Sequence, residues 1–120
     1  MTNEWSTNYD TSFKITKTNS STYIYLWNYQ EYSIENKRLQ VSINQNITTS
    51  SYYFQMIQYD SSKQELNKVE VGVNSNTANP IILTDVTVEN VKYISIRILR
   101  YGDVGNTIFF DDIIITETDL

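Results

Sequence analysis

Two adjacent carboxylates, Asp111 and Asp112, follow the aromatic pair Phe109-Phe110 in the last apolar segment of the chain. Alternate residues of a strand share one face. If this alternation is counted forward from the apolar residues before the pair, Asp112 falls on the core face. If it is counted back from Ile113 and the apolar residues after it, Asp111 falls on the core face instead. Because burying an unpaired charge is costly, the conflict between the two counts predicts a β-bulge near the pair.

A half-buried carboxylate at such a bulge needs backbone donors, a cationic side chain or a Ca²⁺ ion. Two interpretations therefore stay open, a hydrogen-bonded strand aspartate and a Ca²⁺ ligand. Catalysis by the pair has little support. Adjacent strand residues point to opposite sides, whereas the two carboxylates of a glycosidase face each other across roughly 5 Å or more of a cleft.

The composition excludes several classes of function. The chain has no cysteine, hence no disulfide or thiolate site, and no histidine, hence no usual general base or Zn²⁺ ligand. Its formal charge of −5 argues against nucleic acid as a partner, because phosphate contacts need clustered Lys and Arg. No apolar stretch approaches the ~18 residues that membrane insertion as a helix requires. Because the chain lacks the cysteine and histidine side chains that usually serve in catalysis, we expect a protein that is not an enzyme.

Aromatic residues are the other chemically notable group, with ten Tyr and two Trp in 120 residues. Flat amphipathic rings suit the stacking of sugars, and they also occur routinely on strands. Tyr23, Tyr25 and Trp27 fall at period two and are expected to share one face of a strand. Whether that face is core or an exposed aromatic platform stays open.

A second aromatic group comes from two predicted strands, residues 52–59 and 93–99. The alternating isoleucines of the second strand are expected in the core, which leaves Tyr93 and Arg97 on the opposite face. Phe54 and Met56 pointing inward would leave Tyr53 and Gln55 outward. If the strands are neighbours, these four outward residues form one polar-aromatic ligand patch; the alternative is an ordinary solvated sheet face.

Short alternating runs carry these residues, and clusters of Asn, Ser, Thr, Asp and Gly separate them. About eight strands are predicted, at the spacing of an all-β antiparallel sandwich or barrel. The apolar residues favour strands because they are mainly β-branched or aromatic. We expect residues 1–120 to form a single β-sandwich domain that is a module of a larger protein.

Four segments of the chain resemble, in order, the jelly-roll carbohydrate-binding modules of the galactose-binding-domain-like superfamily. They lie at residues 39–44, 53–62, 91–98 and 105–115, the last containing Phe109-Phe110-Asp111-Asp112. The resemblance implies a jelly roll without catalytic activity that binds a polysaccharide or cell-surface glycan. It also implies one structural Ca²⁺ ion held by Asp111 with acidic groups of the N-terminal segment, for which Glu4 and Asp10 are the candidates.

The predicted ligand-binding residues are thus Tyr53, Gln55, Tyr93, Arg97 and Trp27. The same module type occurs in phage tail and surface proteins, so a structural sandwich that makes protein–protein contacts is the alternative function. Either function implies an extracellular, cell-surface or virion-associated location and neighbouring domains as partners. One departure from the family is the turn after Tyr59-Asp60, which has Ser62-Lys63 where a glycine is common.

Overall fold

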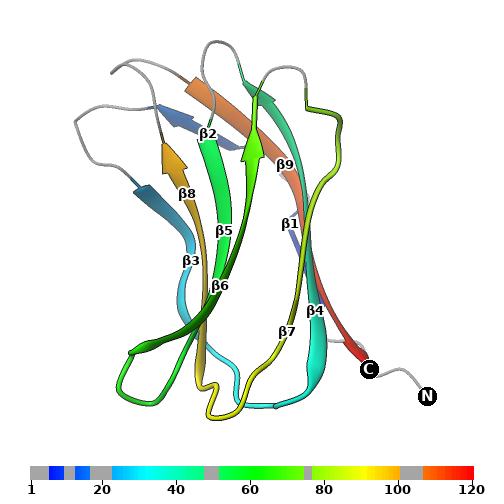
Figure 1. Cartoon of the computed structure of the whole chain (residues 1–120). Coiled ribbons are helices and arrows are strands. Elements are labelled where there is room, and N and C mark those ends of the chain that lie inside the picture. Colours follow the sequence, from blue (N-terminus) through cyan, green and yellow to red (C-terminus); the bar gives the residue numbers. More distant parts are fainter. Residues whose placement is uncertain (1–5, 10–12, 17–22, 48–51, 75–76, 101–106) are drawn as a thin grey trace.

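The computed structural model describes residues 6–9, 13–16, 23–47, 52–74, 77–100 and 107–120. It describes side chains over residues 25–44, 52–74, 77–99 and 114–120. Within these ranges the chain forms nine strands and two sheets (Figure 1). No helix in the described part is long and apolar enough to cross a membrane.

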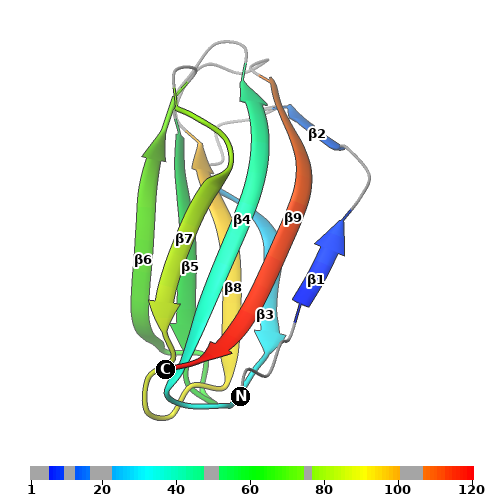
Figure 2. The same cartoon turned by 90° about the vertical axis from the view of Figure 1, so that its right-hand side faces the viewer.

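Sheet A has the order β1-β9-β4-β7, with β2 also paired to β9. Its strands are β1 (Ser6–Tyr9), β2 (Phe13–Thr16), β4 (Lys37–Ile47), β7 (Ile81–Val86) and β9 (Thr107–Asp119). Strands β1 and β2 follow one another along the same side of β9, so together they occupy a single strand position (Figure 2).

Sheet B has the order β3-β8-β5-β6. Its strands are β3 (Tyr23–Glu31), β5 (Tyr52–Tyr59), β6 (Glu65–Val73) and β8 (Tyr93–Arg100). All pairings in both sheets are antiparallel. The chain passes repeatedly between the sheets and returns to place β9 beside β1 and β2. This strand order is that of a jelly roll, as the sequence predicts.

The core forms where the alternating apolar residues of the two sheets meet. Leu39, Val41 and Ile43 are buried on β4 while the residues between them are more exposed. On β8 the buried isoleucines are Ile94, Ile96 and Ile98, as predicted. Buried apolar side chains of both sheets form one cluster. Removal of this apolar area from water is the main stabilising contribution.

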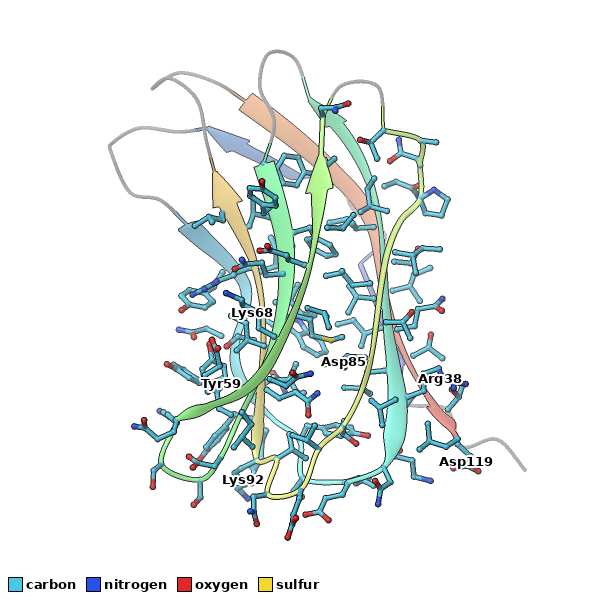
Figure 3. All side chains as sticks on the ribbon, in the orientation of Figure 1. Arg38, Tyr59, Lys68, Asp85, Lys92 and Asp119 are labelled. Carbon is cyan, nitrogen blue, oxygen red and sulfur yellow. The ribbon has the colours of Figure 1, made fainter. Side chains whose placement is uncertain are left out.

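One side of the sandwich is closed by a polar junction around Asp85 of β7 (Figure 3). Asn67 of β6 and Gln58 of β5 donate to Asp85 Oδ2 from their side-chain nitrogens, at 2.7 and 2.8 Å. Gln58 Nε2 also donates to the Val86 carbonyl at 3.0 Å, and its Oε1 accepts from the Val88 N–H at 2.9 Å. Gln58 is only 1% exposed, so this junction ties sheet A to sheet B with satisfied buried polar groups.

Candidate functional site

A row of polar side chains crosses the outer face of sheet B, and we name it the polar row: Tyr25, Arg97, Gln55 and Glu70. Each residue is opposite the next on the neighbouring strand. Arg97 Nε donates to Gln55 Oε1 at 2.7 Å, and Gln55 Nε2 donates to Glu70 Oε2 at 2.6 Å. At the other end Arg97 Nη1 donates to the Tyr25 hydroxyl at 3.4 Å. The polar row therefore satisfies much of its own hydrogen-bonding capacity.

The structure brings together three of the residues predicted to bind a ligand: Tyr53, Gln55 and Arg97 lie on neighbouring strands, as expected. Gln55 does point to the outer face, but its neighbours cover it and leave it 1% exposed. Its amide is committed to Arg97 and Glu70. Tyr53 is 39% exposed. A sugar that bound here would meet the Tyr53 ring and few uncommitted polar atoms of Gln55.

Tyr93 lies apart from the other predicted residues. It is four residues from Arg97 along β8, which is about 13 Å in a strand, and it pairs with Tyr59. Tyr93 belongs instead to a tyrosine cluster with Tyr29 and Tyr59. The ring centroids of Tyr29 and Tyr59 are 4.7 Å apart, and those of Tyr29 and Tyr93 are 6.2 Å apart in an edge-on arrangement. Tyr93 therefore does not lie beside Arg97, although Tyr59 of the cluster is close enough to Arg97 for that charge to oppose the rise that burial causes in the pKa of Tyr59.

Lys63 covers the tyrosine cluster. Its Nζ lies 4.7 Å from the ring centroid of Tyr29 and 5.6 Å from that of Tyr93, which are cation–π distances. Both Lys63 (φ 62°) and Tyr29 (φ 50°) have left-handed backbone conformations. Lys63 occupies the turn where the resembled family commonly has glycine, so its contact with the rings offsets a conformational cost.

Of the two positions left open for Trp27, core or exposed aromatic platform, the structure supports the core. The register of β3 against β8 shifts between Tyr25 and Trp27, and again between Trp27 and Gln30. The first shift places Trp27 opposite the buried Ile96, and Trp27 packs against the core. Tyr25 stays on the outer face beside Arg97. Period-two counting fails because each bulge adds a residue to β3.

The bulge predicted near the Asp pair is confirmed. Ser42 of β4 pairs with Ile114, and Asn44 pairs with Asp111, so β9 has one more residue than β4 between the two pairs. The side chains of Asp111 and Asp112 lie outside the described part, as do Glu4 and Asp10 altogether. Among the side chains that are described, no group of three or more Asp or Glu residues could hold a metal ion.

The outer face of sheet A differs in chemistry from that of sheet B. Alternation on β4, β7 and β9 turns ten described side chains outward: Arg38, Gln40, Ser42, Asn44, Ile82, Thr84, Val86, Ile114, Thr116 and Thr118. Within this described set Arg38 carries the single charge. Ile82 and Ile114 flank Ser42 in one row and are 48% and 36% exposed. We call these ten residues the uncharged face, although one of them, Arg38, is charged.

From the sequence, the continuously apolar run Ile113-Ile114-Ile115 predicts either that both faces of the last strand are covered or that it contacts another domain or subunit, but the ten-residue face itself was not predicted. Its signal is nevertheless present: the residues between the core positions of β4 and β7 are Ser, Thr, Gln, Ile and Val, where a solvated strand usually carries charges. The tyrosine cluster was likewise missed, because it depends on the bulge at Tyr29, which no glycine marks.

No protein-family model matches the chain, and no curated protein matches it. Solved structures do resemble it. The structure of infectious bursal virus derived T=1 particles has a TM-score of 0.60 and 14% sequence identity to this chain. The match covers 98% of this chain and 31% of the viral chain. The infectious bursal disease virus VP2 subviral particle has a TM-score of 0.60 and 13% sequence identity to this chain, and the match covers 98% of this chain and 33% of the viral chain.

A third similar structure is that of Bacillus endospore appendages, a family of disulfide-linked pili. Its TM-score is 0.43 at 11% identity, over 100% of this chain and 92% of the other. The chain spans about a third of the length of the two viral chains. At identities this low, the likeness to the viral particles shows one thing, that the chain has an antiparallel β-sandwich fold in common with them.

Proposed function

We propose that the chain is a structural module of a multi-copy assembly, on a virion or a cell surface, and that it holds to other copies through protein–protein contacts. The observation that carries this proposal is the uncharged face. Exposed Ile82 and Ile114 lie there among Ser and Thr side chains on a surface formed by three neighbouring strands. Interfaces are depleted of charge at their centre and retain apolar side chains.

The viral proteins of similar fold support the same proposal, because they form T=1 and subviral particles. Glycan binding has less support. Tyr93 does not lie beside Arg97, and Gln55 is buried within its own hydrogen bonds.

The test compares two lysine substitutions of equally exposed isoleucines. Ile82 and Ile34 are both 48% exposed, but Ile34 lies in the connection between β3 and β4 and is not one of the ten residues of the uncharged face. We expect Ile82→Lys to lower the average mass measured by light scattering, because a charge would be buried at the contact. Ile34→Lys should leave that mass unchanged. Equal effects of the two substitutions would contradict the proposal.

A further inference from the structure

Among the described strands, β6 offers the longest regular edge. Strands β1/β2, β3, β6 and β7 lie at the edges of the described sheets. The first position is divided into β1 and β2, β3 has two register shifts, and β7 has six residues. In contrast, β6 pairs with β5 without interruption from Asn67 to Val73. Open edges of this kind accept another strand by backbone hydrogen bonding.

The side chains of β6 alternate in a way that suits pairing with itself. Val69 and Val71 pack toward the core, whereas Lys68 and Glu70 are exposed on the outer face (Figure 3 labels Lys68). Lys68 and Glu70 therefore flank Val69 with opposite charges on one face. An antiparallel two-fold pairing repeats every contact twice, so the sequence around its axis decides whether the strand is self-complementary.

We propose that β6 pairs antiparallel with β6 of a second copy, about a two-fold axis through Val69, to form one continuous eight-stranded sheet. This inference rests on the proposed function and specifies one of its contacts. The axis sets Lys68 of each copy opposite Glu70 of the other. Opposite charges facing each other across strands stabilise pairing, and here two such pairs form.

Other axes fit less well. Residues opposite each other in an antiparallel ladder point to the same face, so the axis has to pass through a residue. An axis through Lys68 or Glu70 would set two like charges against each other, which is destabilising. An axis through Asn67 or Val71 would leave both charges without an opposite partner. Of these registers, the one through Val69 is favoured by charge.

The same register also brings exposed apolar side chains near one another. Leu66, which is 36% exposed, lies at the register shift between Glu65 and Asn67, and the pairing brings this end of β6 close to Gly72 of the second copy. The Tyr53 ring lies over Gly72, 3.4 Å from where a Cβ would be. Leu66 of one copy therefore comes near the exposed Tyr53 ring of the other.

The test is charge exchange measured by sedimentation equilibrium. We expect Lys68→Glu and Glu70→Lys each to weaken the dimer at least about tenfold, because two opposite-charge pairs become two like-charge pairs. The double variant Lys68→Glu/Glu70→Lys restores both pairs and the net charge, so its dissociation constant should return to within about threefold of wild type. Glu89→Lys, an exposed substitution between β7 and β8, is the control for added charge and should have no effect.

The outcomes separate this inference from the proposed function. A wild-type protein that stays monomeric would overturn both. Association that none of the β6 variants changes, or single variants that weaken it without recovery in the double variant, would overturn the β6 pairing alone. Amide hydrogen exchange gives an independent measure: peptides covering residues 66–72 should become protected as the protein concentration rises, and unchanged exchange there would also refute the pairing.

Discussion

Two glutamines of β5 are equally buried, and the structure predicts that their loss has unequal effects. Gln58 and Gln55 are each 1% exposed. Gln58 holds an Asp85 oxygen, the Val86 carbonyl and the Val88 N–H at the junction of the sheets. Two neutral bonds at about 1 kcal/mol and one to a carboxylate at about 2 kcal/mol give roughly 4 kcal/mol. Leucine at this position regains about 1 kcal/mol by apolar burial, so Gln58→Leu should cost about 3 kcal/mol.

Gln55→Leu is the matched control. It also removes two strong hydrogen bonds, but Glu70 is exposed and Arg97 is half-buried, so both charges regain water. We expect a cost of about 1 kcal/mol or less for this change.

Urea unfolding gives both free energies, and the melting temperature should fall by about 10 °C for Gln58→Leu and by about 3 °C for Gln55→Leu. An equal or larger loss for Gln55→Leu would refute the view that the polar row is a surface network and the Asp85 junction a structural one.

Three further predictions follow from the turn, the buried tyrosines and the bulge. Lys63→Gly should be more stable than Lys63→Ala by about 1 kcal/mol in urea unfolding, because both lose the cation–π contact but only glycine removes the left-handed strain; equal stabilities would argue against strain at this turn. Burial raises the pKa of Tyr32 and Tyr52 above the ordinary value of 10.0, and Glu117 raises that of Tyr32 further. The two tyrosines therefore keep their phenolic protons to a higher pH in the folded state than in the unfolded state. The free energy of unfolding should consequently fall as pH rises above about 10. A free energy that stays constant between about pH 9 and 11 would contradict this. If Asp111 holds Ca²⁺, the melting temperature should rise in Ca²⁺ relative to chelator, and Asp111→Asn should abolish the rise; no difference removes the metal.

Much of the fold was predictable because β-strand alternation is a local signal. The buried positions of β4 and β8 and the bounds of β5 follow from the order of apolar residues alone. The bulge on β9 was predictable for the same reason: two local counts disagreed by one residue, and only an inserted residue reconciles them. The strand Ser6–Tyr9 was not predicted, because its polar sequence carries no alternation.

The candidate site was less predictable, because it depends on neighbours that are distant in sequence. Gln55 reads as an outward polar residue, yet Arg97 and Glu70 from two other strands bury it. Trp27 reads as sharing a face with Tyr25, but bulges in β3 turn it to the core. The uncharged face is visible only once β4, β7 and β9 are known to be adjacent.

The central claim is that copies of this chain associate through protein contacts, and the most direct test is the mass of the wild-type protein in solution. Sedimentation equilibrium from low micromolar to several hundred micromolar concentration measures it without any substitution. We predict an average mass that rises with concentration above the 14.0 kDa of one chain. A mass that stays at 14.0 kDa throughout the series would contradict the account.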